Sequence, residues 1–564
     1  MTQETISALI AEAHTSRAIP PGRRLVSYKN IGNLLRERAG SLGEKEWLIY
    51  YPDDRGEARV RYSYKRFYED IARCASYLQS LGVTRGDKVA TFSFNHPDTV
   101  IQYFGALSLG AVVVPLNVGE DDKRTAFIIG DSRPRVILHR DQFAPRVREI
   151  LATVPQGEAR PVGEGEFHRG ISAHTAEFPS GVEAGPDDEA LIVYTSGTTG
   201  HPKGVVLTQY NLLVDARAIA EWHGLTSEER IMCVLPIHHV NGTVVTLITP
   251  LYAGGSVVLN RRFHSESFFE RAAAENVNVA SVVPTLLQFL LHEYRDRERP
   301  DLSALRYLIC GAGPLTVELA SRFEQKFGIP VIHGYGLSET TCYSCFLPHG
   351  LTAGEHRHWM ADFGFPSIGL AIPPNEMAIH DAGGRECEEG ARGEIVIRGH
   401  NVMKCYYANP AANEAAFTHG WFRSGDEGFF RRDSSGRSYF FITGRIKELI
   451  IRGGANVSPF EIDEVLMNMP GVKAGLAVGF ENDWYGEEVG AYVQPSGREE
   501  LTPERVIDYC RKFLPFQKCP KVVLFGDDIP VTSTGKYQRV KLRPLFEKWK
   551  SVQFSESARG RDRS

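Results

Sequence analysis

The sequence predicts an α/β enzyme. It should have a large N-terminal domain of two parallel-type α/β subdomains plus a β subdomain, and a small mobile α+β C-terminal domain. Helical patterns alternate with short Val/Ile/Leu runs over residues 31–333. Short β-like runs between glycine-containing turns follow over residues 375–445, and a compact mixed segment follows these. We therefore expect domains at residues 1–446 and 447–564.

The first alternation of helix and strand begins with residues 67–81. Apolar side chains recur there at helical spacing, and Gly82 provides a C-terminal stop. We expect a strand at 89–92, a second helix at 99–109 and a strand at 111–115. Since helices and strands alternate, the strands should be parallel and ligands should bind at their carboxyl ends.

The second alternation predicts helices at 267–276, 285–294 and 317–327, with strands at 279–283, 305–309 and 331–333. The β subdomain should contain strands at 394–398 and 439–442. The C-terminal domain should contain helices at 459–469, 502–514 and 541–550 and a strand at 474–478.

Composition limits the classes of function. The formal net charge is −5 and 24% of residues are charged, so we expect neither nucleic acid nor an anionic membrane as a partner. No run reaches 18 uninterrupted apolar residues and no signal peptide is evident. The nine cysteines are scattered, which is typical of a reducing compartment. We expect a cytoplasmic enzyme, monomeric or homodimeric.

Residues 194–208 are the most informative stretch, reading Tyr-Thr-Ser-Gly-Thr-Thr-Gly-His-Pro-Lys-Gly-Val-Val-Leu-Thr after the apolar run 191–193. Glycines let backbone N–H groups surround an anion, hydroxyls add neutral donors, and Lys203 adds a charge. Because Pro202 precedes that lysine, the stretch is not a Walker A loop. A phosphate-binding loop is therefore expected, with a flexible linker as the alternative.

Four later motifs supply further groups for chemistry on a nucleotide. Glu339 lies among hydroxyls after the predicted strand 331–333, where a carboxylate could hold Mg²⁺ beside phosphates or simply begin a helix. Asp426 could accept hydrogen bonds from a ribose diol, and Arg445 adds a cation. Lys536 ends a loop of small residues. Taken alone, each of the last three is equally compatible with a solvated turn.

Together and in this order, these motifs resemble those of the acyl-adenylate-forming superfamily. That superfamily includes acyl-CoA synthetases, the adenylation domains of nonribosomal peptide synthesis, and luciferases. The resemblance covers residues 31–545 and is closest in style to acyl-CoA ligases. It implies ATP, Mg²⁺ and coenzyme A as cofactor or co-substrates and a carboxylic acid as substrate.

The resemblance also implies roles for individual residues. The ATP phosphates would be held by Thr195, Ser196, Gly197, Thr198, Thr199, Gly200 and Lys203. The rest of the nucleotide site would comprise Gly311, Ala312, Gly313, Pro314, Tyr335, Gly336, Ser338, Thr340, Asp426 and Arg445, with Glu339 as the Mg²⁺ ligand. The catalytic residues would be Lys536, Thr195, Glu339 and His239, with Lys447 at the hinge and Gly453, Gly454 and Ala455 on the coenzyme A face.

The acid pocket matches the superfamily motif less well. His239 matches its histidine as a gate or carboxylate-side contact, although it could also be a packed structural histidine, and His238 replaces the usual aromatic residue. The aminoacyl-activating branch carries an aspartate here, so Val240 and Asn241 disfavour an α-amino acid. The expected pocket residues are His239, Val240, Asn241, Gly242, Thr243, Leu337, Cys342 and Ser344.

The expected pocket walls at 240–246, 283–285 and 337–346 contain no Lys or Arg. We therefore expect a monocarboxylic acid with an aryl or a medium- to long-chain body. Coenzyme A is the expected acceptor, because the sequence of segment 453–459 resembles that found in CoA ligases and no carrier module follows residue 546. The alternatives are a stand-alone adenylating enzyme that loads an acyl-carrier protein or another nucleophile, and a luciferase-like oxygenase.

Overall fold

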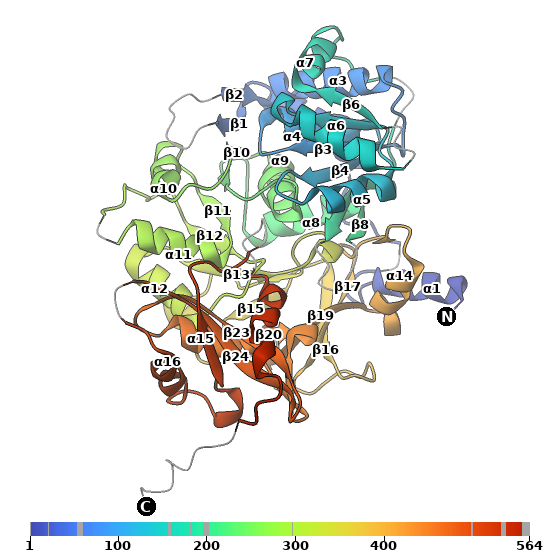
Figure 1. Ribbon diagram of the computed structural model, residues 1–564. Coiled ribbons are helices and arrows are strands. Elements are labelled where there is room, and N and C mark those ends of the chain that lie inside the picture. Colours follow the sequence, from blue (N-terminus) through green and yellow to red (C-terminus); the bar gives the residue numbers. More distant parts are fainter. Residues whose placement is uncertain are drawn as a thin grey trace, which may run out of the picture.

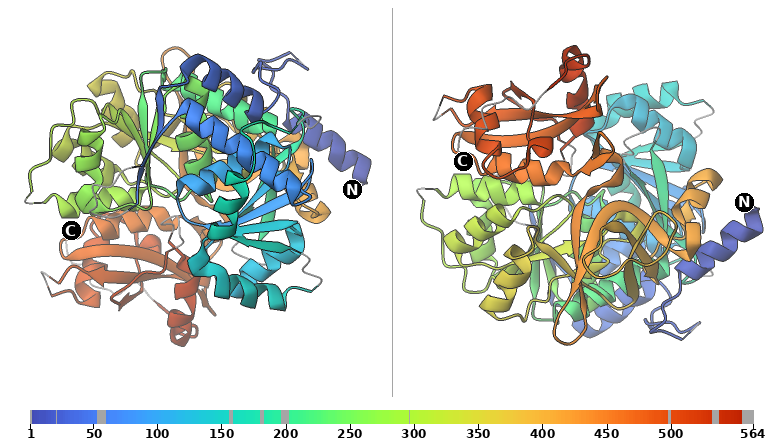
Figure 2. Two further views of the ribbon diagram at one scale, coloured as in Figure 1. Left: turned by 90° about the horizontal axis from the view of Figure 1, so that it is seen from above. Right: turned by 90° about the horizontal axis from the view of Figure 1, so that it is seen from below.

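The computed structural model describes residues 2–20, 22–52, 60–155, 159–179, 183–195, 202–295, 297–497, 500–531 and 537–554. Two sheets and their helices form a large N-terminal part, and a third sheet forms a small C-terminal part that packs beneath it (Figures 1 and 2). The predicted mixed α/β fold is confirmed. Within the described ranges, no helix is both long enough and apolar enough to cross a membrane.

The first sheet has seven strands in the order β18-β8-β7-β4-β3-β5-β6. Its parallel strands are β3 (Lys88–Ser93), β4 (Val112–Asn117), β5 (Val136–His139), β6 (Arg160–Gly163) and β7 (Glu189–Thr195). An antiparallel edge is formed by β8 (Lys203–Thr208) and β18 (Cys405–Tyr406). The helices of this part are α2 (Ile31–Leu42), α3 (Tyr64–Ser80), α4 (Pro97–Ser108), α5 (Asp122–Ser132), α6 (Ala144–Thr153) and α7 (Glu164–Ser172).

The second sheet has thirteen strands in the order β16-β17-β19-β20-β15-β14-β13-β12-β11-β9-β10-β1-β2. Its parallel region contains β1 (Glu46–Tyr51), β9 (Arg230–Cys233), β10 (Ser256–Asn260), β11 (Val279–Val282), β12 (Tyr307–Cys310) and β13 (Val331–Tyr335), with β2 (Val60–Ser63) antiparallel at the edge. Its antiparallel region contains β14 (Cys345–Phe346), β15 (Ser367–Ala371), β16 (Asn375–His380), β17 (Gly393–Gly399), β19 (Phe422–Arg432) and β20 (Ser438–Arg445). The β subdomain therefore continues the second α/β sheet through β14, rather than forming a sheet of its own.

Helices cover the second sheet, and those at 265–274, 284–293 and 317–327 lie close to the predicted places, whereas the others were not predicted. The helices are α8 (Gln209–Trp222), α9 (Thr249–Ala253), α10 (Ser265–Ala274), α11 (Pro284–Glu293), α12 (Val317–Phe327) and α13 (Ala353–Ala361), with a π-helix at Asn241–Ile248. Two further helices, α1 (Gln3–Ala13) and α14 (Pro410–Ala416), lie side by side at one edge of the molecule (Figure 1). Most of α8 is buried, which explains its apolar composition on all sides.

The C-terminal sheet contains β21 (Ile450–Arg452), β22 (Ala455–Val457), β23 (Val472–Asn482), β24 (Gly486–Pro495) and β25 (Val522–Phe525). The helices α15 (Pro459–Met467) and α16 (Pro503–Cys510) confirm two predicted helices with shorter bounds. The predicted helix at 541–550 is present as a 3₁₀ helix, Arg539–Trp549, rather than as an α-helix. Pro544 lies inside it, and proline removes an N–H donor and clashes with the preceding turn of an α-helix.

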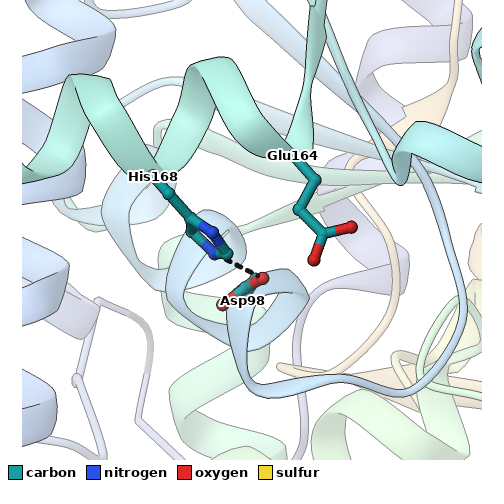
Figure 3. Close-up of side chains that lie close together, drawn as sticks. All are labelled: Asp98, Glu164 and His168. Carbon is teal, nitrogen blue, oxygen red and sulfur yellow. Dashed lines mark hydrogen bonds and ion pairs between the residues drawn. The ribbon is translucent and has the colours of Figure 1, made fainter.

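A network of ion pairs joins α4, α7 and the loop after β5. Figure 3 shows its Asp98–His168 pair and the nearby Glu164. Asp98, Glu164 and His168 lie close enough together to hold a metal ion. However, the Arg140 guanidinium reaches Asp98 at 2.8 Å and Glu164 at 2.6 Å, so a protein cation already pairs with both carboxylates. Burial alone would raise the pKa of Asp98, but hydrogen bonding to His96 and the charges of His96, His168 and Arg140 lower it to about 2.

We expect Asp98→Asn to lower the free energy of unfolding by about 2 kcal/mol at pH 7, because an Asp pKa two units below its usual value stabilises the native state by this amount. The folded-state pKa is depressed from 3.8, so the contribution is present above pH 4 and is lost as the pH falls towards 2. Urea unfolding at pH 7 and pH 3 measures it. Glu44→Gln, in an exposed pair with Lys65 at 3.8 Å, is the control. An equal loss at both pH values would contradict the prediction.

Candidate active site

A cavity of about 300 Å³ lies where the three sheets meet. One wall comes from the first sheet and α5, another from the segment before the π-helix and the turn after β13, and a third from the C-terminal part. Its lining includes Asn117, Glu120, Arg124, Tyr194, Thr195, Pro202, His238, His239, Val240, Asn241, Val283, Ala312, Gly336, Leu337, Ser338, Cys342, Tyr343, Val531, Gln538 and Lys541. Residues far apart in the sequence thus meet at the carboxyl ends of β7, β11, β12 and β13.

The predicted phosphate loop connects β7 to β8, and both of its ends are at the cavity. Thr195 and Pro202 line the cavity, and Lys203 begins β8 opposite Thr195. The predicted residues Ser196, Gly197, Thr198, Thr199 and Gly200 lie outside the described residues. Gly204 follows, where a Cβ would lie 2.9 Å from the Ile192 side chain, so the two strands can approach this closely only with glycine there.

Lys203, Glu339 and Tyr406 form a compact group in this region. The Tyr406 hydroxyl donates to Glu339 Oε1 at 2.7 Å, and Lys203 Nζ lies 4.1 Å from the Tyr406 ring centroid. Burial lowers the pKa of Lys203, the nearby Glu339 charge opposes this shift, and Lys447 adds to it. A carboxylate and an ammonium group of opposite charge thus share a site that can hold Mg²⁺ and phosphate oxygens.

A tight turn after β13 sets the position of Glu339. At Gly336 a Cβ would lie 2.0 Å from the Cys342 carbonyl oxygen, so no side chain fits there. Residues Ser338–Thr340 form a 3₁₀ turn, in which the Leu337 N–H donates to Thr340 Oγ1 at 3.1 Å. The Met403 N–H donates to the Glu339 carbonyl oxygen at 2.7 Å and fixes the turn from the other side.

Tyr335, Asp426 and Arg445 meet at the position that the resemblance gives to the adenosine. The Tyr335 hydroxyl donates to Asp426 Oδ2 at 2.6 Å, and Arg445 Nε lies 2.8 Å from Asp426 Oδ1. Asp426 is 1% exposed and is paired with Arg445 in the register of β19 and β20. Burial and the Asp426 charge raise the pKa of Tyr335.

The remaining residues predicted for the adenine slot follow β12. Ala312 has a φ of 61° and lines the cavity, while Gly313 and Pro314 line a smaller recess that also contacts Tyr537 of the C-terminal part. At Gly311 a Cβ would lie 2.6 Å from the Tyr343 hydroxyl oxygen. The strand end therefore turns around the Tyr343 side chain.

Only part of the predicted acid pocket lies on the cavity wall. His239, Val240, Asn241, Leu337 and Cys342 line the cavity. By contrast, Gly242, Thr243 and Ser344 are buried behind it and do not belong to the lining. At Gly242 a Cβ would lie 2.4 Å from the Pro236 carbonyl oxygen, and the Ser344 hydroxyl is 2.9 Å from Thr340 Oγ1.

Three uncharged polar side chains form a chain of hydrogen bonds at this wall. Asn241 Nδ2 donates to the Tyr343 hydroxyl at 3.1 Å, and the Ser281 hydroxyl donates to Asn241 Oδ1 at 2.7 Å. Burial lowers the pKa of His238 to about 4, so its imidazole is uncharged at neutral pH. Its ring centroid lies 4.5 Å from that of His239.

The sequence analysis missed several residues of the site. Arg124 on α5 and Lys541 of the C-terminal part both line the cavity, so the complete wall contains cations that the three expected wall segments lack. Tyr406 was also missed, although it contacts the predicted metal ligand. None of these residues carries a local motif. For Tyr406, the informative signal would have been the pairing of β18 with β8.

The C-terminal part presents one of its faces to the cavity. Val531 and Gln538 line it, and Lys536, which lies between them in the sequence, is outside the described residues. Lys447 is exposed and close enough to Lys203 to lower its pKa. Gly453, Gly454 and Ala455 connect β21 to β22 and are absent from the cavity lining. Both glycines adopt positive φ angles, 57° and 85°.

Comparison with known proteins shows which protein family this chain matches. Residues 35–407 match the model of the AMP-binding enzyme family, and residues 461–536 match the AMP-binding enzyme C-terminal domain. An oxalate–CoA ligase of Arabidopsis thaliana is 33% identical over 506 residues, 87% of this chain and 95% of the relative. The long-chain-fatty-acid–CoA ligase FadD13 of Mycobacterium tuberculosis is 32% identical over 522 residues, 92% of this chain and 99% of the relative.

The crystal structure of ATP-bound MatB from Rhodopseudomonas palustris superimposes with a TM-score of 0.82. The two chains are 26% identical, and the match covers 93% of this chain and 100% of MatB. The fold similarity therefore extends over both the large and the small part.

We expect Tyr406→Phe to raise the KM for Mg²⁺-ATP about tenfold, because it removes a hydrogen bond to an ionised carboxylate. The substitution keeps the ring beside Lys203. Steady-state kinetics over a range of Mg²⁺ and ATP concentrations measures the effect, and Tyr407→Phe on the adjacent residue is the control. An unchanged KM in Tyr406→Phe would show that the hydroxyl does not orient Glu339 for metal binding.

Proposed function

The chain belongs to the AMP-binding enzyme family, and from this we propose that it activates a monocarboxylic acid with ATP and transfers the acyl group to coenzyme A. The observation that supports this proposal is the shared cavity. Thr195, which pairs with Lys203 across β7 and β8, and Ser338, which precedes Glu339, both line it. Val240 and Cys342 of the acid wall line the same cavity. An acid and a nucleotide can therefore bind within reach of each other.

In the first step the substrate carboxylate oxygen attacks the α-phosphorus of ATP. A bond forms between them, the bond from the α-phosphorus to the α,β-bridging oxygen breaks, and pyrophosphate leaves with that electron pair. Lys203 would bind the phosphate oxygens on which negative charge accumulates, and Thr195 would donate a hydrogen bond. Asp426 would hold the ribose, supported by Arg445 and Tyr335.

Glu339 fits an Mg²⁺ ion, because its carboxylate is 9% exposed, is oriented by Tyr406 and faces a lysine that would bind phosphate. When bound, the ion would neutralise charge on the phosphate oxygens and on the leaving pyrophosphate. The protein's own contribution is to orient this carboxylate and to keep Lys203 beside it.

In the second step the coenzyme A thiolate attacks the acyl carbon and AMP leaves with the electrons of the mixed anhydride bond. The C-terminal residues at the cavity would obstruct this approach. We therefore propose that the C-terminal domain rotates about Lys447 and brings Gly453, Gly454 and Ala455 to the site. The glycines would let the chain pass close to the pantetheine arm.

The wall chemistry favours an aryl or medium- to long-chain monocarboxylate. His238 is neutral at pH 7 and offers no positive charge for a second carboxylate. Of the two cations on the cavity wall, Arg124 lies 3.7 Å from the Glu120 carboxylate, with which a second substrate carboxylate would compete, and Lys541 belongs to the C-terminal part that we propose to move. Asn241 is already bonded to Ser281 and Tyr343, and its amide does not replace the carboxylate that would bind a substrate ammonium group. The oxalate and long-chain fatty acid in the relatives' names differ too much to select a substrate.

A panel of aliphatic, aromatic and dicarboxylic acids tests the function. We expect pyrophosphate release with aryl or medium- to long-chain monocarboxylates, with multiple turnovers only when coenzyme A is present. A single stoichiometric burst in either condition would instead favour transfer to a carrier protein or another nucleophile. Light emission or oxygen consumption would favour an oxygenase, and higher turnover with dicarboxylates would contradict the substrate class.

We expect Lys536→Ala to slow acyl-AMP formation by about 10²–10³-fold, because it removes a cation placed for the transition-state charge. Thioester formation from supplied acyl-AMP should change little, since the lysine would serve only the first step. Quenched-flow measurement of each half-reaction separates the two effects. Lys548→Ala, an exposed lysine nearby in the sequence, is the control. Equal losses in both half-reactions would contradict this division of roles.

A further inference from the structure

The N-terminal helix α1 packs onto the antiparallel region of the second sheet, beside α14 (Figure 1). It precedes residue 35, where the match to the AMP-binding enzyme model begins. Ala13 is fully buried, and Glu12 lies so close to Gly420 that a Cβ there would be 2.3 Å from the Glu12 carboxyl carbon. The helix is therefore closely fitted to the surface beneath it.

His14 directly follows α1 and hydrogen-bonds to the main chain near the active site. Its Nε2 lies 2.8 Å from the Met403 carbonyl oxygen. A carbonyl oxygen only accepts hydrogen bonds, so Nε2 carries the proton and donates. The ring also meets Phe417 edge-on, with 6.5 Å between centroids.

Met403 is also hydrogen-bonded to Glu339, the proposed metal ligand. Its N–H donates to the Glu339 carbonyl oxygen at 2.7 Å. Three residues later Tyr406 donates to the Glu339 carboxylate at 2.7 Å and lies beside Lys203. The segment 400–407 thus links His14, at the end of α1, to Glu339 in the candidate active site.

The same segment is held by the first sheet. The Lys404 N–H donates to the Val206 carbonyl oxygen at 2.9 Å, and the Tyr407 N–H donates to that of Gly204 at 2.7 Å. The first of these bonds holds the N–H of the peptide that joins Met403 to Lys404, and Asn211 Nδ2 donates to the carbonyl oxygens of His400 and Val402. His14 adds the donor to the Met403 carbonyl oxygen of that same peptide.

We propose that His14 is a positioning residue for nucleotide binding, because its hydrogen bond to Met403 holds the segment that orients Tyr406 and Glu339. This inference deepens the proposed function and rests on the assignment of Glu339 to Mg²⁺-ATP. Loss of the donor leaves the Met403 carbonyl without its partner and lets this end of the segment relax. Nucleotide affinity then falls, while the acid wall, which this segment does not form, is unaffected.

The test measures binding of Mg²⁺-ATP to the full chain by calorimetry, without an acid, so that no turnover is needed. His14→Phe keeps an aromatic ring against Phe417 and removes the donor. We expect it to raise the Kd about three- to tenfold, the range for loss of one neutral hydrogen bond. His14→Gln, whose amide nitrogen reaches the place of Nε2, should restore the affinity. Glu4→Gln, on the exposed face of α1, should leave it unchanged.

A merely structural role would give a different pattern. In that case His14→Phe would lower the thermal midpoint and leave the Kd unchanged, or His14→Gln would fail to restore the Kd, and either result would overturn the proposal. Should His14→Phe not fold, His14→Asn, whose shorter amide does not reach Met403, replaces it with the same expectations. Kinetics should then show a higher KM for ATP and an unchanged KM for the acid.

A double-mutant cycle adds an independent criterion. If His14 acts through the 400–407 segment, His14→Phe should weaken nucleotide binding much less in a Tyr406→Phe background than in the wild type. Additive effects would overturn the proposed route. Absence of acid-dependent turnover in the wild type would reject the proposed function, whereas the Mg²⁺-ATP binding data would still decide the role of His14.

Discussion

The nearly buried Glu339 carboxylate is the charge on which the rest of the site depends. A carboxylate in this position needs donors and cations around it, because burial without them costs several kcal/mol. Tyr406 supplies the donor and Lys203 supplies the cation. The site thus requires the turn after β13, the start of β8 and the short strand β18 to meet, and the β8–β18 pairing brings the last two together.

A second buried carboxylate, that of Asp426, is likewise surrounded by a hydrogen-bond donor and a cation. Asp426 is almost completely buried, and it is held by the Tyr335 hydroxyl and by Arg445 directly across the β19–β20 pair. A neighbouring strand places the cation here, so the arrangement is rigid and independent of the C-terminal part. One end of the proposed nucleotide site is therefore built into the large sheet, while the proposed phosphate end lies close to Lys447, the proposed hinge.

The sequence predicted α3, α4, α10, α11 and α12 and the strands β3, β4, β11, β12 and β13 near their observed places, because alternating apolar patterns depend on local periodicity. Many other helices and strands were not predicted. The sequence also pointed to Lys203, Glu339 and Asp426, whose motifs are local. It missed Tyr406, Arg124 and His14 because they reach the site only through tertiary packing. Pro544 was a local signal against an α-helix at the C-terminus and could have been used. The continuity of the β subdomain with the second sheet depends on β14, which is two residues long and too short for a periodic pattern to reveal.

The contacts between the two parts bear on the proposed rotation of the C-terminal domain. They are polar and individually modest: Arg392 pairs with Glu461 at 2.8 Å, and Glu464 accepts a hydrogen bond from the Val317 N–H at 3.2 Å. Exposed or half-exposed contacts of this kind are easily exchanged for water. Lys447 and Lys203 repel each other in this arrangement, and that repulsion disfavours it when phosphate is absent. In the proposed reaction the triphosphate would screen both lysines and favour this arrangement, and departure of pyrophosphate would remove part of that screening. The charge of the substrate itself would thereby couple the first chemical step to the domain movement needed for the second.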